Sequence, residues 1–419
     1  MLATTTPART TWATQLATPS GVLVAGLLSG TSCDGVDVVL CRVRLAPDGA
    51  DLLPPELVAS QTVPYEDLPG GGALRQVLLS WIEGRALEQH SAAWLGAIAC
   101  AHRDIAQVFA HALQRVEALH KVRVDLVGSH GQTVWHHDGH ALWRGAQGQR
   151  ATLQLGDLST LAACTQRAVV GDFRWADLAA GGEGAPLVAL VDHLLFPQLP
   201  RPAAILNLGG IANLTLLGAR TDELLAFDVG PANCILDTLA RELLGQACDE
   251  DGACALSGRV QADLLRSWAS HPYFSVLPPK STGRDTFSRA WVLSLLEPVR
   301  HSLSPADLLA TAVELVALTV GEALARYGGV QPGGARPGPL VVAGGGALNP
   351  ALMRALERHC GAVCAAEQVG TTARAREGLL FALLAARHVA GLPSTHPGAT
   401  GARRGGVLGL YAPAPHFGL

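Results

Sequence analysis

The apolar and polar positions of this 419-residue chain describe a similar unit twice. In the first unit, three runs with strand-like alternation precede two stretches with helical spacing of apolar residues. These are Val22–Leu28, Val36–Leu45 and Glu56–Val63, then Ala73–Glu83 and Ser91–Leu119. In the second unit the same order returns as Ala203–Leu208, Ile211–Leu216, Leu224–Asp228 and the helix Asn233–Leu244. Each unit opens with a hairpin turned by glycines.

The intervening segments add strands and helices to both units. Short strands are expected at Val122–Gly128, Leu153–Gly156, Ala168–Gly171 and Pro339–Ala343. Helices are expected at Leu187–Phe196, Arg289–Leu296, Pro305–Arg326, Pro350–His359 and Arg376–Ala390. Residues 248–288 read as an irregular loop rich in turn residues.

Two such units predict a two-domain α/β chain of the actin/hexokinase-like (ribonuclease H-like) class, with a cleft between the domains. A Rossmann fold is less consistent with the sequence, because no Gly-x-Gly-x-x-Gly motif joins a predicted strand to a predicted helix. We expect residues 1–20 to be a disordered extension. Residues 21–185 plus 376–419 then form domain I, and residues 186–375 form domain II.

Composition narrows the class of partner and the compartment. The net charge of −4 gives no basic surface for nucleic acid or an anionic membrane. Nine cysteines without a Cys-x-x-Cys pair favour reduced thiols and a cytoplasmic location. The first twenty residues lack the apolar core of a signal peptide, and the longest apolar helix carries Glu314 and Glu322. These features predict a soluble protein.

Glycines, hydroxyls and carboxylates crowd the first turn, Gly26–Asp37. Gly30 and Gly35 tolerate positive φ, so backbone N–H groups could approach an anion closely. Asp34 and Asp37 would repel a bare phosphate. Their presence in a phosphate-binding turn is therefore explained if a Mg²⁺ ion lies between the carboxylates and the phosphate. An ordinary hairpin turn is the alternative on this stretch alone, because Gly and Asp are common turn residues.

Three further features in the second half fit the same chemistry. The hairpin Asn207–Asn213 could hold a polyphosphate from the opposite side, and Gly344–Gly346 could let a flat base lie against backbone. Asp228 follows a strand, where it could lie near Mg²⁺; a plain helix entry with Asn233 as the N-cap is the alternative. Lys280 could contact an anion or lie in a solvated loop.

Two loops in the first half carry candidate sugar-side groups. Asp177 lies in a glycine-rich loop where Gly181 and Gly182 would let a ligand approach, so it is the candidate general base. His130, at the predicted strand end, is the candidate ligand-binding histidine. The nearby cluster of His136, His137 and His140 lacks a Cys or Glu at zinc-ligand spacing.

Together these segments resemble the anhydro-N-acetylmuramic acid kinases of peptidoglycan recycling, from about residue 21 to the C-terminal end. The motifs that carry the resemblance are Ser29-Gly-Thr-Ser-x-Asp-Gly-Val-Asp37, His130-Gly-Gln-Thr-Val-Trp-His136, Leu153-Gln-x-Gly-Asp157, Val170-Gly-Asp-Phe-Arg174, Asp177-x-Ala-x-Gly-Gly182, Gly184-Ala-Pro-Leu187, Asn207-x-Gly-Gly-Ile-Ala-Asn-Leu214, Lys280-Ser-Thr-Gly-Arg284 and Gly344-Gly-Gly346 with Asn349-Pro350. Three positions depart from the family pattern: Cys33, Ala232 and Glu183.

The resemblance implies a hexokinase-like enzyme that uses ATP and Mg²⁺ on 1,6-anhydro-N-acetylmuramic acid. Water opens the anhydro ring while O6 receives the γ-phosphoryl group, with Asp177 as the catalytic aspartate. The implied ATP-binding set is Gly30, Thr31, Ser32, Cys33, Asp34, Gly35, Val36, Asp37, Gly209, Gly210, Asn213, Gly344, Gly345 and Gly346. The implied sugar-binding set is His130, Gln132, Thr133, Arg174, Gly181, Gly182 and Glu314, and the implied Mg²⁺ set is Asp34 and Asp228, through water. A homodimer is expected.

Two other functions are weighed against this one. Another sugar or acetate-type kinase of the same superfamily would need no water-activating base, so Asp177 discriminates against it. A sugar-sensing repressor on the same fold would carry an N-terminal helix-turn-helix and a cysteine-rich zinc loop. The short N-terminal leader and scattered cysteines count against the repressor.

Overall fold

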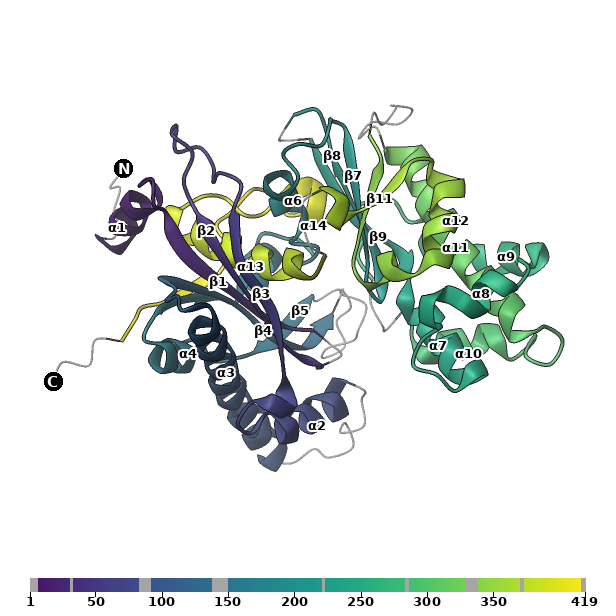
Figure 1. Cartoon of the computed structure of the whole chain (residues 1–419), viewed down its shortest axis with the longest axis horizontal. Coiled ribbons are helices and arrows are strands. Elements are labelled where there is room, and N and C mark those ends of the chain that lie inside the picture. The colour runs from purple at the N-terminus through teal and green to yellow at the C-terminus, as the bar shows by residue number, and fades with distance from the viewer. Residues whose placement is uncertain are drawn as a thin grey trace. The chain divides into compact units, whose positions relative to one another are not determined.

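The computed structural model describes residues 7–30, 33–82, 92–137, 150–220, 223–282, 286–328, 338–369 and 373–415. The chain folds into two compact units, each with its own sheet (Figure 1). Unit 1 comprises Met1–Leu195, Arg374–Pro397 and Ala402–Leu419, and unit 2 comprises Phe196–Ala373 and Gly398–Gly401.

Unit 1 is built on a sheet of order β12-β6-β4-β1-β2-β3, with β5 paired to β4. Its strands are β1 (Val22–Ser29), β2 (Gly35–Val43), β3 (Glu56–Pro64), β4 (Leu126–His137), β5 (Ala151–Leu155), β6 (Ala168–Gly171) and β12 (Leu410–Ala412). Its helices are α1 (Pro7–Leu16), η1 (Tyr65–Asp67), α2 (Gly71–Ile82), α3 (Ala92–His120), α4 (Leu158–Thr165), α5 (Phe173–Ala179), α6 (Ala189–Leu195) and α13 (Ala373–Ala390). The short α14 (Pro397–Thr400) lies where the chain crosses between the units.

Glycines let α13 lie directly on the unit 1 sheet. A Cβ on Gly26 of β1 would come within 1.8 Å of the Gly378 carbonyl oxygen, and one on Gly128 of β4 within 2.1 Å of the Phe381 carbonyl oxygen. α3 contributes Ile105 and Phe109, both fully buried, to the main core cluster of this unit. The close approach of α13 places the start of that helix beside the ends of β1 and β4.

Unit 2 contains a five-stranded sheet of order β11-β10-β7-β8-β9. Its strands are β7 (Ala203–Leu208), β8 (Ile211–Leu217), β9 (Leu224–Pro231), β10 (Leu340–Ala343) and β11 (Val363–Ala365). Its helices are α7 (Asn233–Leu244), η2 (Glu250–Gly252), α8 (Ala253–Ser257), α9 (Ala262–Ala269), η3 (Pro272–Ser275), α10 (Arg289–Leu296), α11 (Pro305–Tyr327), η4 (Gly345–Leu348), α12 (Pro350–Cys360) and η5 (Ala366–Val369).

The two sheets share one topology. In unit 1 the path β3-β2-β1-β4-β6 joins three antiparallel strands to two strands parallel to β1. In unit 2 the path β9-β8-β7-β10-β11 does the same about β7. The architectural repeat expected from the hydrophobic pattern is therefore confirmed, and with it the α/β class.

Among the described residues, α11 is the one helix long and apolar enough to cross a membrane by length and composition. It is a core helix, since 67% of its apolar window is buried inside the protein. Leu308, Leu315 and Val316 on this helix are fully buried in the unit 2 core. Ser304 caps the helix by accepting a hydrogen bond from the Asp307 N–H at 3.1 Å.

The N-terminal extension was expected to be disordered, yet residues 7–16 form helix α1. Tertiary contacts explain the difference. Leu16 is fully buried, and its carbonyl accepts from the Leu45 N–H at 2.9 Å. The Trp12 indole N–H donates to the Tyr411 hydroxyl at 3.4 Å. Contacts with distant segments, including the C-terminal strand β12, therefore stabilise a helix that residues 7–16 would form only weakly by themselves.

Four other local predictions were wrong. β4 continues through Ser129–Thr133 because β5 pairs with it, and β9 continues through Asp228 to Pro231 because it pairs with β8. The N-cap of α7 is Ala232, and no side chain caps it. The predicted loop 248–288 contains the short helices α8 and α9, and Trp268 of α9 is buried.

Candidate functional site

The first turn is held by side chains from two neighbouring elements of unit 1. The Gln132 amide N–H donates to the Gly30 carbonyl at 3.2 Å, and the Cys33 thiol donates to its Oε1 at 3.6 Å. Arg75 Nε donates to the Cys33 carbonyl at 2.7 Å. Gln132 was predicted to bind sugar; in the structure its amide positions the turn. Thr31 and Ser32 lie outside the described residues.

Gly35 is needed in this turn for close packing and not for a positive φ. Gly35 does not adopt a left-handed conformation; a Cβ there would lie 2.6 Å from the Val63 carbonyl oxygen. Cys33 is left-handed, with φ +52°. The departure to cysteine thus falls at the strained position, where its side chain is fully buried.

The remaining members of the set point in different directions. Val36 is fully buried in β2, and Asp37 accepts a hydrogen bond from the Thr62 hydroxyl. The Asp34 side chain is 73% exposed, with Arg75 3.6 Å away. Asp34 is therefore the carboxylate of this turn that a hydrated cation could reach.

Asp177 is buried completely at the end of α5. Its Oδ2 accepts from the Gly184 N–H at 2.8 Å, and its carbonyl accepts from the Gly182 N–H at 2.9 Å. A Cβ on Gly182 would lie only 2.2 Å from Oδ2. Gly182 is therefore needed because the Asp177 carboxylate occupies the space of a side chain.

Arg174, on the same helix, joins this loop to β4. Its NH1 donates to the Gly184 carbonyl at 2.6 Å, and its Nε donates to His130 Nε2 at 3.1 Å. Burial lowers the pKa of Arg174 to about 10, against the opposing effect of the Glu377 and Asp177 carboxylates. The guanidinium remains charged at neutral pH and lies near two carboxylates.

His130 is a neutral, buried imidazole. Burial and the Arg174 charge hold its pKa well below the ordinary value of 6.5. The ring stacks on Phe381 of α13 with 4.5 Å between centroids. Because Nε2 accepts from Arg174, Nδ1 carries the proton. Thr133, one residue beyond Gln132, accepts at its hydroxyl from the Gln154 amide at 3.2 Å.

The Gly181–Glu183 loop is fixed by two arginines. Arg150 donates to the Gly181 carbonyl at 3.1 Å and pairs with Glu183 at 2.6 Å. The Arg403 N–H donates to the Ala180 carbonyl at 3.0 Å. The acidic departure at Glu183 is therefore neutralised inside the loop.

One functional candidate, Glu377 on α13, was missed from the sequence. Its side chain is exposed to solvent; desolvation by the surrounding protein raises the pKa of Glu377, Arg376 and Arg174 oppose the shift, and Asp37 adds to it. Glu377 therefore interacts electrostatically with Asp37, next to the first turn, and with Arg174, next to the Asp177 loop. The sequence feature that could have identified it is that Glu377 is the only acidic residue in helix α13, Ala373–Ala390.

In unit 2, the second hairpin and the triple glycine share contacts with Asn233. Asn233 donates from its backbone to the Gly209 carbonyl at 3.0 Å and from its side chain to the Leu208 carbonyl at 3.1 Å. A Cβ on Gly345 would lie 3.6 Å from the same side-chain nitrogen. Gly344 is left-handed, with φ +85°, and Gly346 packs on Leu208.

The protein itself does not require glycine at three of these positions. Gly209, Gly210 and Gly345 have no left-handed φ, and a Cβ on any of them would meet no atom of the described residues closer than 3.6 Å. Open space over such glycines suits a ligand that must touch backbone.

Asp228 anchors a loop rather than facing open space. Its two carboxylate oxygens accept from Asn213 Nδ2 at 3.0 Å and from the Thr282 N–H at 2.9 Å. Lys280 is buried over the Tyr273 ring, with its ammonium 4.4 Å from the ring centroid. Burial lowers the pKa of Lys280 to about 8, against the Asp228 charge. The solvated-loop alternative for Lys280 is therefore wrong.

The donor set for a metal ion is sparse. Among the described residues there is no group of three His, Cys, Asp or Glu side chains that could hold a metal. Asp34 in unit 1 fits a hydrated Mg²⁺ bound mainly by phosphates, whereas both oxygens of Asp228 in unit 2 already accept protein hydrogen bonds.

Glu314, predicted to bind the sugar, has partners within unit 2. On α11 its carboxylate pairs with Arg358 at 2.5 Å and with His359 Nε2 at 2.7 Å, both on α12. Burial alone would raise the pKa of Glu314, but the hydrogen bonds from His359 and Arg358 lower it. The residue ties two helices of unit 2 together.

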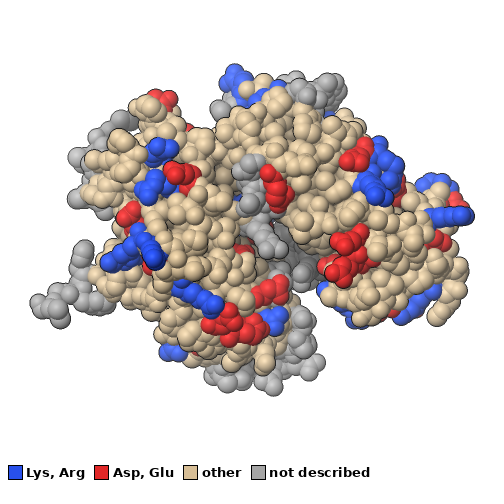
Figure 2. Space-filling view, in the orientation of Figure 1, with Lys and Arg blue, Asp and Glu red and all other residues tan. Residues whose placement is uncertain are grey.

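On the face drawn in Figure 2, basic and acidic side chains are interspersed among the described residues.

The repeated sheet, with a glycine hairpin in each unit, defines an α/β protein of the actin/hexokinase-like class. The xylulose kinase from Rhodospirillum rubrum aligns weakly, at 15% identity over 85% of this chain and 89% of that one, with a TM-score of 0.40.

Comparison of sequences gives the family. Residues 22–414 match the family described as anhydro-N-acetylmuramic acid kinase. The relative from Salinibacter ruber is 42% identical over 402 residues, covering 94% of this chain and 96% of its own. That from Parasynechococcus marenigrum is 40% identical, covering 94% and 100%. The chain belongs to the anhydro-N-acetylmuramic acid kinase family, and the resemblance seen in its motifs is confirmed.

Proposed function

We propose that the chain converts 1,6-anhydro-N-acetylmuramic acid, ATP and water into N-acetylmuramic acid 6-phosphate and ADP, in the recycling of peptidoglycan. The observation that supports this most directly is the Asp177 carboxylate. It is fully buried and fixed against the Gly182 backbone and the Gly184 N–H. A carboxylate held this way can accept a proton at one position.

In the proposed reaction, Asp177 takes a proton from a water molecule whose oxygen bonds to C1 of the sugar. The C1–O6 bond breaks, and O6 forms a bond to the γ-phosphorus as ADP leaves. Arg174, which remains charged beside Asp177, stabilises negative charge in this loop. We add Glu377 to the sugar-side set because it lies in the electrostatic range of Arg174 and Asp37.

ATP is assigned to both glycine turns. The open backbone at Gly209, Gly210 and Gly345 supports contact with the nucleotide in unit 2. In unit 1 the phosphates are assigned to the turn whose Gly30 and Cys33 carbonyls are held by Gln132 and Arg75. Mg²⁺, when bound, would neutralise phosphate charge; Asp34 would hold it through water, and Asp228 would act indirectly by positioning its loop.

The test compares Asp177→Asn with Asp104→Asn, an exposed aspartate on α3 paired to its neighbour Arg103. Each purified variant is incubated with ATP and the anhydro sugar in ¹⁸O-water, and products are read by mass spectrometry. Asp177→Asn should lose turnover by about 10²-fold or more while retaining ATP affinity, and Asp104→Asn should match the wild type. Substantial product from Asp177→Asn contradicts the base assignment.

The position of the label separates this reaction from that of another sugar kinase. ¹⁸O at C1 supports coupled ring opening. A phosphorylated product with its anhydro ring intact would instead support a plain sugar kinase of the same superfamily. We further propose a cytoplasmic homodimer, as the cysteine pattern and the family resemblance suggest; light scattering of the purified protein tests the dimer.

A further inference from the structure

Two of the arginines beside the Asp177 loop already face carboxylates of unit 1. Arg150 pairs with Glu183 at 2.6 Å. Burial lowers the pKa of Arg174, and the Glu377 and Asp177 carboxylates oppose that shift. Both of these positive charges are therefore balanced by groups of the protein itself.

Arg403, the third arginine at this loop, has no such partner. Among the described residues, no carboxylate lies within ion-pair distance of its guanidinium. Its backbone N–H donates to the Ala180 carbonyl at 3.0 Å, and its Nε lies 3.4 Å from the same oxygen. The two terminal nitrogens make no hydrogen bond within the described part of the chain, and the side chain is exposed. A guanidinium in this state can offer both N–H groups of its fork to an incoming carboxylate.

The position of Arg403 relates it to the proposed base. A Cβ on Gly181 would lie 3.2 Å from Arg403 Nε, and a Cβ on the next residue, Gly182, would lie 2.2 Å from Asp177 Oδ2. Consecutive Cα atoms are about 3.8 Å apart. The free guanidinium and the Asp177 carboxylate therefore contact neighbouring residues of one loop, a spacing that a substituted sugar ring can bridge.

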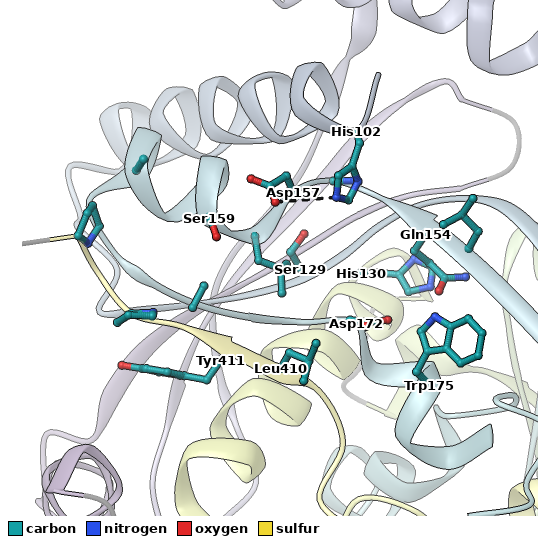
Figure 3. Close-up of a pocket in the computed structure, with 17 residues that line it drawn as sticks. His102, Ser129, His130, Gln154, Asp157, Ser159, Asp172, Trp175, Leu410 and Tyr411 are labelled. Carbon is teal, nitrogen blue, oxygen red and sulfur yellow. Dashed lines mark hydrogen bonds and ion pairs between the residues drawn. The ribbon is translucent and has the colours of Figure 1, made fainter. Parts of the chain in front are cut away.

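A nearby cavity of unit 1 is unsuited to an anionic group. It has a volume of about 760 Å³ and lies at the ends of β4 and β5, where Asp157 and Asp172 are on its wall (Figure 3). No lysine or arginine is among the described residues that line it. A carboxylate would be repelled there, whereas at Arg403 it would meet an unbalanced positive charge.

We propose that Arg403 determines specificity for the acid form of the sugar. This inference rests on the proposed function, whose substrate carries a lactyl ether on O3 that ends in a carboxylate. The Arg403 guanidinium binds that carboxylate while C1, two ring atoms away from C3, faces the water that Asp177 deprotonates. Discrimination against a sugar that lacks the lactyl group then depends on this one side chain.

The test compares two sugars and two matched variants of the full-length protein. The sugars are 1,6-anhydro-N-acetylmuramic acid and 1,6-anhydro-N-acetylglucosamine, which lacks the lactyl ether. Arg403→Gln should lower kcat/KM for the acid about tenfold through KM, the value of one charge-assisted hydrogen bond, and should leave kcat/KM for the neutral sugar unchanged. Arg404→Gln removes the same charge from the next residue, which is also exposed, and should change neither value. Arg403→Lys should keep part of the preference, because the charge remains and the fork is lost.

Two results would overturn the proposal. One is an unchanged preference for the acid in Arg403→Gln. The other is an equal loss for both sugars, which would mean that Arg403 only supports the loop.

Calorimetric titration of each sugar without ATP repeats the comparison independently of turnover. Loss of the affinity difference between the two sugars in Arg403→Gln supports the proposal, and persistence of that difference contradicts it. Absence of product from the wild type with both sugars would count against the proposed kinase reaction, and the titration would still decide the role of Arg403.

Discussion

Gly182→Ala tests whether the Asp177 loop is built around its carboxylate. Gly182 has no left-handed φ, so alanine fits its backbone. The obstacle is the new Cβ, which would lie 2.2 Å from Asp177 Oδ2, whereas real Cβ atoms essentially never come within 3.0 Å. The carboxylate must therefore retreat by at least 0.8 Å, the difference of these two distances. It would pull away from the Gly184 N–H, which it now meets at 2.8 Å.

A displacement of about 1 Å in a catalytic group can cost about 10²-fold in rate. We therefore expect kcat to fall about 100-fold, and overpacking to lower the free energy of unfolding by about 1–3 kcal/mol. ATP affinity should not change, since the open glycines of unit 2 are untouched. The assay is steady-state product formation from ATP and the anhydro sugar, with urea unfolding measured in parallel.

The matched control is Gly72→Ala on α2, where a Cβ would meet nothing within 4 Å. It should leave kcat unchanged. Two results would refute the reasoning. One is wild-type kcat in a folded Gly182→Ala protein. The other is a raised KM with unchanged kcat, which would mean that Gly182 serves only the approach of the sugar.

Two further predictions concern unit 2. Because the pKa of Lys280 is about 8 in the folded protein and the ordinary lysine value is 10.5, the unfolded chain binds more protons between these values, and stability should rise with pH there. The free energy of unfolding should rise by up to about 3 kcal/mol, and this rise should be absent from Lys280→Met. Urea unfolding at pH 8 and pH 10 measures it for both proteins. The same pH dependence in the variant and the wild type would contradict the prediction. Glu314→Gln should lower stability by about 1 kcal/mol at neutral pH, because it weakens the pairs with Arg358 and His359, and should leave the sugar KM unchanged. A raised KM would return Glu314 to the sugar site.

The sequence was sufficient for the parts of the fold that depend on local pattern. Alternation and turn chemistry located the strands of both hairpins, and helical spacing located α3, α11 and α12. Boundaries that depend on a partner strand were wrong, since β4 extends only because β5 pairs with it. The order in α1 depends on Trp12 and Leu16 contacting distant segments, which no local pattern contains.

The candidate site divides in the same way. Asp177 could be found because glycines around a carboxylate leave a local signature. Gln132 and Glu314 could not be assigned, because a polar side chain in a motif is equally consistent with binding a ligand and with bonding the protein's own backbone or a neighbouring helix. Glu377 lay outside any loop and became a candidate only once α13 was seen against β1 and β4.

The two glycine turns show most clearly what the structure adds. Both read as places where backbone approaches phosphate, yet Gly35 is required by the Val63 carbonyl 2.6 Å from its Cβ position. At Gly209 and Gly210 the nearest atom in the part of the chain that the structure describes is 3.8 Å from that position. A glycine that the fold does not need is stronger support for a ligand than one that it does. On this criterion the backbone of unit 2 is the better-supported nucleotide contact, while the support for the first turn is the exposed Asp34 carboxylate.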